Sequence, residues 1–100
     1  MLIFISNSSY SQWTPQALGI STTGRDLMDI EVVDENIVWA VSRDNAGVAH
    51  VNDVVVTTNG GTTWTPRAIT IAPSTYDFSC ITAVDANRAW AGMYNATGTG

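Results

Sequence analysis

The sequence repeats itself at a spacing of 51 residues, and this repeat constrains the fold more than any other feature. When Trp13 is aligned with Trp64, residues 13–49 face residues 64–100 without a gap, and 13 of the 37 aligned positions are identical. Chance alone would give several times fewer identities. A unit that recurs at a fixed spacing of this length folds as one supersecondary unit and stacks on its neighbour. We therefore expect two copies of one unit, the second of them incomplete.

Each copy reads as a series of short strands. In the first copy, β-branched and apolar runs are separated by turn-forming residues, and these runs span 29–33, 37–42, 54–58 and 63–70. The fourth run contains Pro66, and proline within a sheet is confined to edge strands. We therefore expect the fourth strand at the outer edge of its unit. No segment shows the 3.6-residue apolar spacing of a helix.

The second copy repeats the first two strands, at 78–84 and 88–93, around a turn at 85–87. A four-stranded unit of about 50 residues is typical of a β-propeller blade. The predicted fold class is all-β: a partial β-propeller of about two four-stranded antiparallel blades, the second incomplete, in units 13–63 and 64–100. Two stacked units bury only one face between them, and such stacks usually need three or more. The propeller is therefore expected to need further blades or oligomerisation to close.

A short motif joins the third and fourth predicted strands. It reads Thr-Thr-Asn-Gly-Gly-Thr-Thr-Trp over residues 57–64. It resembles the Asp box, also called the BNR repeat, a Ser-x-Asp-x-Gly-x-Thr-Trp hairpin of sialidases, sortilin-type receptors, xyloglucanases and photosystem-assembly-factor-like propellers. Asn59 stands at the Asp position, which keeps a hydrogen-bond acceptor and loses the charge, and Thr57 stands at the Ser position.

The physical roles of the motif residues are those of a tight loop. A glycine supplies positive φ, the Asn59 side chain bonds backbone N–H groups, and the Trp64 ring packs under the turn. In proteins of this kind the Asp box usually lies on the outer rim of the propeller. The resemblance therefore implies a structural motif, made of Thr57, Asn59, Gly60, Gly61, Thr63 and Trp64.

The resemblance extends over residues 12–100, because the pattern Val-Asp-x-Asn-x-x-Trp-Ala occurs at both 33–40 and 84–91. Similar blades occur in secreted Bacteroidetes proteins. The resemblance implies a non-catalytic module of a secreted or cell-surface bacterial protein that binds or displays protein or glycan. Two alternatives stay open: a fragment of a glycoside hydrolase of the xyloglucanase or sialidase type, and an assembly-factor-like scaffold.

The N-terminal residues differ in character from the repeat. Residues 1–5 are apolar and residues 6–11 are small and polar, which is typical of the end of a secretory signal peptide. We interpret residues 1–11 as a signal-peptide remnant and residues 12–100 as the propeller fragment. The alternative is an ordinary first strand at 2–5. The apolar run is too short to span a membrane, so no membrane insertion is expected.

Charge and cysteine content limit the partners. The net charge is −5, with four arginines and no lysine, so the clustered cations that bind nucleic acid or anionic membranes are missing. Cys80 is the single cysteine and lies in an apolar run, which predicts a small buried core residue. His50 has no His or Cys partner at metal spacing. We expect no metal, no cofactor and no nucleic-acid partner.

Five residues outside the recurring pattern are candidates for ligand binding. Asp29 and Glu31 lie two apart on a predicted strand and would share a face, as an acid and base pair does. Their counterparts in the second copy are Cys80 and Thr82, so the pair belongs to one unit only. The other three lie in or beside an oxygen-rich loop, and the full set is Asp29, Glu31, Asp44, His50 and Asp53.

Two tryptophans recur at equivalent positions, Trp39 and Trp90. Recurrence favours a role in packing between units over stacking on a carbohydrate. Asp34 and Asp85 recur in the same turn, which favours turn formation over acid catalysis. The sequence therefore predicts that recurring residues are structural and that function lies among those that do not recur.

Overall fold

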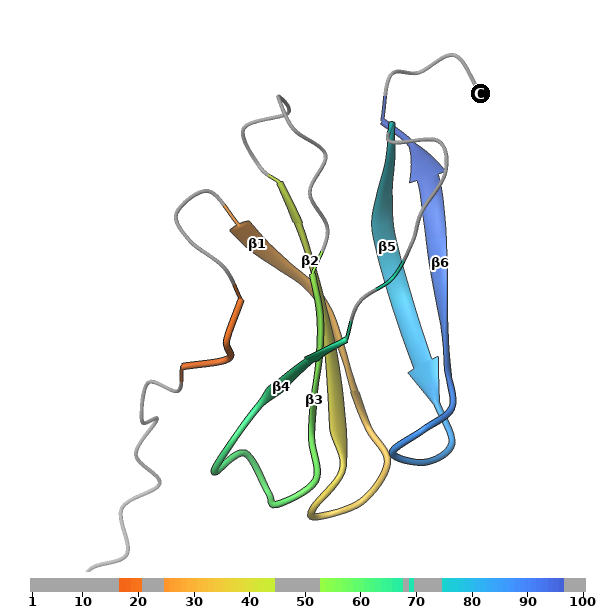
Figure 1. The fold of residues 1–100 in the computed structure, drawn as a ribbon. Helices are drawn as coiled ribbons and strands as arrows, with labels where there is room; N and C mark the ends of the chain where they lie inside the picture. Colours follow the sequence, from red (N-terminus) through yellow and green to blue (C-terminus); the bar gives the residue numbers. More distant parts are fainter. Residues whose placement is uncertain (1–16, 21–24, 45–52, 68, 70–74, 97–100) are drawn as a thin grey trace, which may run out of the picture.

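The computed structural model describes residues 17–20, 25–44, 53–67, 69 and 75–96. The described part of the chain is all-β and contains no helix, as predicted. Two antiparallel sheets hold all its strands (Figure 1). The first has the order β1-β2-β3-β4 and the second pairs β5 with β6. The strands are β1 (Arg25–Val32), β2 (Val38–Asp44), β3 (Val54–Thr57), β4 (Thr65–Arg67), β5 (Tyr76–Ala83) and β6 (Ala89–Asn95). This architecture is consistent with a partial propeller.

The 51-residue repeat is present in the structure down to single residues. Each end of β1 and β2, moved by 51 residues, gives the corresponding end of β5 and β6. The β1–β2 register shifts between Leu27 and Asp29, and the β5–β6 register shifts between Phe78 and Cys80, again 51 residues later. Two copies of the same hairpin, with the same bulge, therefore follow one another along the chain.

The strand bounds differ from the expected ones at a few ends. β1 and β5 begin earlier than predicted, because pairing continues across the bulge to the ends of β2 and β6. β4 has only three residues, where a longer strand was expected. It contains Pro66 and lies at the edge of the first sheet, which confirms the position predicted from proline chemistry.

The turn between the two strands of each hairpin is held by an aspartate. The Asp34 carboxylate accepts hydrogen bonds from the amides of Asn36, at 2.8 Å, and Ile37, at 2.7 Å. In the second copy, Asp85 accepts from the Asn87 amide, also at 2.8 Å. Aspartate favours such turns because its short side chain reaches the backbone two residues on. Both recurring aspartates thus have the structural role predicted for them.

The β5–β6 hairpin packs against one face of the four-stranded sheet (Figure 1). The core lies between the two units, and burying each of its large side chains contributes about 1.5–3 kcal/mol. The buried members come from three strands, β2, β3 and β5: Trp39, Val41, Val54, Val56, Phe78 and Ile81. Since neither unit encloses these residues alone, the core exists only because the units stack.

Cys80 is exposed, and the prediction of a buried core cysteine is wrong. The bulge after Phe78 breaks the strict alternation of the strand, so Phe78 and Ile81 both enter the core. Cys80 lies between them and pairs with Gly92 on the neighbouring strand. A Cβ atom at Gly92 would lie 2.5 Å from the Cys80 sulfur. The thiol therefore occupies space that a side chain at residue 92 would need.

Candidate binding site

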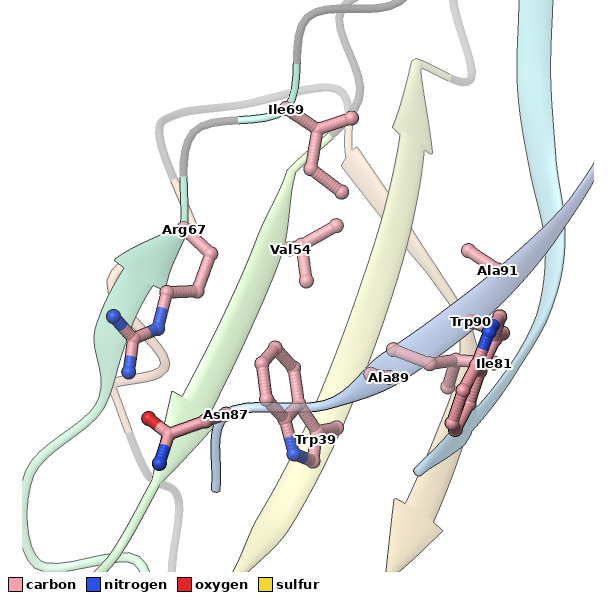
Figure 2. Close-up of a pocket in the computed structure, with 9 residues that line it drawn as sticks. All are labelled: Trp39, Val54, Arg67, Ile69, Ile81, Asn87, Ala89, Trp90 and Ala91. Atoms are coloured by element: carbon pink, nitrogen blue, oxygen red, sulfur yellow. The ribbon is translucent and has the colours of Figure 1, made fainter. Parts of the chain in front are cut away.

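A pocket of about 240 Å³ opens between the two units (Figure 2). Its floor and walls are mostly aromatic and aliphatic, and its polar groups are one guanidinium and one amide. The lining residues come from both sheets: Trp39, Val54, Arg67, Ile69, Ile81, Asn87, Ala89, Trp90 and Ala91. A concave, largely apolar site with a few polar groups is the usual form of a ligand pocket.

The two recurring tryptophans lie on this pocket in different states. Trp39 is only 5% exposed and belongs to the core. Its indole Nε1 donates a hydrogen bond to the backbone oxygen of Asp85, at 2.9 Å, so it links the first unit to the turn of the second. Packing between units is therefore confirmed for Trp39. Trp90 is 58% exposed and presents its ring beside the pocket.

Asp29 and Glu31 lie at the junction of the two units and do not line the pocket. The Asp29 carboxylate accepts two backbone hydrogen bonds, from Ile30 and from Ile81, each at 2.9 Å. Glu31 accepts a bond from the Thr82 hydroxyl at 3.3 Å. Asp29 on β1 thus bonds β5, the equivalent strand of the second copy. A hydrogen bond from an amide to a carboxylate is stronger than one between two neutral groups.

The two remaining candidates that the structure describes, Asp44 and Asp53, lie near Arg25, where β1 begins. Asp44 is the last residue of β2 and pairs with Arg25 across the β1–β2 ladder. The Asp53 carboxylate lies 3.3 Å from the Arg25 guanidinium, and its backbone oxygen accepts from Ser42. His50 lies outside the described residues. The four candidates among the described residues therefore lie in or next to strands of the first sheet, and none of them lines the pocket.

Residues 57–64 form a compact hydrogen-bonded loop between β3 and β4. The Thr57 hydroxyl oxygen accepts from the Gly61 amide at 2.9 Å, and the Asn59 side-chain oxygen accepts from the Thr63 amide at 2.9 Å. Asn59 also donates to the Thr63 hydroxyl at 2.8 Å. The asparagine therefore uses both its carbonyl and its amide, and an aspartate there would lack the donor.

The glycines of this loop are required by its backbone. Gly60 and Gly61 have φ of 67° and 91°, which disfavour residues with a Cβ. The Gly60 amide donates to the backbone oxygen of Asn36, at 3.0 Å, so the loop also touches the first hairpin turn. Trp64 is half-buried at the loop's end, less enclosed than the expected ring under the turn.

Two arginines make exposed polar contacts in or near the second unit. Arg43 donates to the Tyr94 hydroxyl at 2.7 Å, a contact that raises the pKa of Arg43. Arg88 donates to Asp85 at 2.8 Å. The pKa of Asp85 lies below its ordinary value, first because the Asn87 amide bonds the carboxylate and second because of Arg88. Like Glu31 and Thr82, Arg43 and Tyr94 are 51 residues apart, so equivalent positions touch.

Several lining residues of the pocket were not singled out by the sequence. Arg67 belongs to a short edge strand of the first sheet and Asn87 to the turn of the second, and they approach each other only because the two sheets pack together. Ile69 and Ile81 are ordinary apolar residues in the sequence. Only the recurring tryptophans gave a signal, because aromatic residues at equivalent positions of a repeat mark the stacking face.

No three His, Cys, Asp or Glu side chains among the described residues are placed to hold a metal ion. The same part of the chain has no long apolar helix of the kind that crosses a membrane. Comparison with family models, curated proteins and solved structures gives no significant match to this chain.

Proposed function

We propose that the chain is a non-catalytic β-propeller-type module of a secreted or cell-surface bacterial protein, and that it binds a protein or glycan ligand. The observation that carries the proposal is the pocket between the units, with the exposed Trp90 ring at its side. An exposed indole beside an apolar hollow offers a large contact area at small entropic cost.

The placement of the acidic residues supports binding over catalysis. Asp29, one member of the acid and base pair considered from the sequence, accepts hydrogen bonds from two backbone amides. Glu31 is bonded by a hydroxyl of the second unit. A general acid and base must reach a bound substrate, and the residues that line the pocket include no carboxylate. The Asp-box-like loop closes one end of the first sheet through its own hydrogen bonds, which supports a structural role for it.

A binding screen with a hydrolysis assay tests the proposal. The intact chain is applied to a glycan array and to a peptide library, and it is incubated with xyloglucan and with sialosides. We expect binding without turnover, and a Trp90→Ala variant is expected to lose binding while keeping its fold. Val84→Ala, at an exposed residue outside the pocket, serves as the control. Release of sugar by the wild-type chain contradicts the proposal.

A further inference from the structure

Asn59 and Gly60, in the loop between β3 and β4, form a chemically labile dipeptide. Asparagine loses its side-chain amide when the backbone nitrogen of the next residue attacks the side-chain carbonyl carbon. This attack is fastest where the next residue is glycine, because glycine has no Cβ to hinder it. Asn59 is the only asparagine of the sequence that a glycine follows. The loop therefore holds the one dipeptide of the chain that favours this reaction most.

The turn itself requires a glycine at this position. Gly60 has φ of 67°, a conformation that residues with a Cβ rarely adopt. A Cβ there would also lie 3.3 Å from the backbone oxygen of Glu35. Asn59 and Gly60 are both exposed, so water reaches them. The labile pair is thus a consequence of the loop geometry, and solvent is present for the reaction.

In the native loop the attacking atom is already engaged. The Gly60 amide donates to the backbone oxygen of Asn36, on the first hairpin turn, at 3.0 Å. The reaction requires the Gly60 nitrogen to lose its proton and to approach the Asn59 side chain. The hydrogen bond to Asn36 opposes both steps and has to break first.

The Asn59 carboxamide is held at both of its polar atoms. Its oxygen accepts hydrogen bonds from the Thr57 hydroxyl and from the Thr63 amide, each at 2.9 Å. Its nitrogen, which is the leaving group of the reaction, donates to the Thr63 hydroxyl at 2.8 Å. These bonds fix the side chain toward Thr57 and Thr63. It is therefore not free to turn toward the Gly60 nitrogen while the loop is closed.

We propose that Asn59-Gly60 is a deamidation site, which the closed loop protects and which reacts when the loop opens. In the open loop the Gly60 nitrogen bonds to the Asn59 Cγ and the Cγ–Nδ2 bond breaks. The Gly60 amide proton leaves with the side-chain nitrogen as ammonia. Water then opens the cyclic imide at either of its carbonyls, and no oxidant or reductant takes part. This modification site is independent of the ligand proposed for the pocket.

The two products, aspartate and isoaspartate, affect the loop differently. An aspartate at residue 59 keeps the acceptor for the Thr63 amide and lacks the amide donor to the Thr63 hydroxyl. An isoaspartate adds a methylene to the backbone of the turn, which displaces the Gly60 amide from Asn36. We expect the aspartate form to close the loop again and the isoaspartate form to leave it open. Loop opening is thereby recorded as a covalent change that refolding does not reverse.

The first test compares the intact chain with a synthetic peptide of residues 55–63, which has the same dipeptide without the fold. Both are incubated in one buffer at mildly alkaline pH, and mass spectrometry of peptide fragments follows the mass gain at Asn59. We expect the folded chain to react at least about tenfold more slowly than the peptide, because only its open fraction reacts. In concentrated urea the two should react at the same rate, while Asn87, which precedes Arg88, stays largely intact. Equal rates of chain and peptide in buffer overturn the proposal.

A pair of variants tests whether the side-chain bonds of the loop give the protection. Thr63→Val removes the hydroxyl that holds the leaving nitrogen. It should speed deamidation of the native chain about fivefold, the effect of one lost hydrogen bond on the open fraction. Thr58→Val, at the exposed residue before Asn59, should react as wild type. In urea all three chains should react alike. If both variants react at the wild-type rate in buffer, the bonds of Asn59 do not protect the site and the proposal is wrong.

The refolded products test the record of loop opening. Chains that have reacted in urea are refolded, and their aspartate and isoaspartate forms are separated by chromatography. Hydrogen exchange at the Gly60 amide should be slow in the aspartate form, as in an Asn59→Asp variant. It should be fast in the isoaspartate form, because the bond to Asn36 is not made again. Equal protection of this amide in the two forms contradicts a lasting record.

Discussion

The two copies of the hairpin have the same backbone and opposite environments. Trp39 is 5% exposed in the first copy, and its equivalent Trp90 is 58% exposed in the second. The reverse holds at another position, where Ile30 is 46% exposed and its equivalent Ile81 is 6% exposed. One copy thus buries its tryptophan face, and the other buries its isoleucine face.

This difference shows that local structure and burial have separate origins. Strand bounds, bulge and aspartate turn are the same in both copies, so they follow from the sequence of each hairpin. Burial depends on which face meets a neighbour, since a repeat unit has no complete core of its own. Ile30 on the first copy and Trp90 on the second are the members of these pairs that stay exposed.

The largest effect on stability is expected when the two equivalent tryptophans are replaced in turn. Trp39→Ala should destabilise the chain by about 3–5 kcal/mol, the usual cost of a large-to-small change in a core. Trp90→Ala should change stability by only about 0.5 kcal/mol, as exposed substitutions do. Urea unfolding followed by circular dichroism measures both. Similar costs for the two variants would show that the copies do not differ in packing.

A smaller effect is expected where the second copy has a glycine in place of a valine. Val41 is buried in the core, and its equivalent Gly92 lies under the Cys80 sulfur. Gly92→Val should destabilise by about 1–3 kcal/mol, because the new side chain overlaps the thiol. The same urea titration measures it. The double variant with Cys80→Ala should recover much of the loss, and the absence of any recovery would exclude the thiol as the cause.

The sequence predicted most of the fold and less of the site. The repeat, the strands, the turns and the edge position of Pro66 were readable because each depends on local chemistry at fixed spacing. Cys80 was predicted to be buried because it lies in an apolar run. The prediction failed because the bulge that changes the alternation of this strand has no clear local signal in the sequence. The pocket was missed because Arg67 and Asn87 come together only through packing of the two sheets.

The hydrogen-bonded loop between β3 and β4 offers a third test. Thr57 is buried, and its hydroxyl oxygen accepts from the Gly61 amide at 2.9 Å. Thr57→Val keeps the shape and removes the acceptor, so the free energy of unfolding should fall by about 1–2 kcal/mol. Thr58→Val, at the exposed neighbour, is the matched control. Equal stability of the two variants in urea would show that the loop does not depend on this bond.

The smallest effect concerns the hairpin turns, where the second copy has Arg88 and the first has Ile37. The pKa of Asp85 is lowered from 3.8, with the Asn87 amide as the larger cause and Arg88 as the next. A lowered pKa means that the Asp85 carboxylate stabilises the fold above its unfolded pKa and that this contribution is lost as pH falls through the folded pKa.

Arg88→Ala should therefore raise the pKa of Asp85 toward 3.8 without reaching it, because the Asn87 amide still bonds the carboxylate. Acid destabilisation would then begin at a slightly higher pH. Carbon-13 NMR titration of the Asp85 carboxyl measures the shift directly, and Arg43→Ala, whose contact with Tyr94 lies at the other end of the β5–β6 hairpin, controls for the loss of one positive charge. If both variants shift the pKa of Asp85 equally, the cause is the change in net charge. If only Arg88→Ala does, the contact with Arg88 accounts for this difference between the two turns.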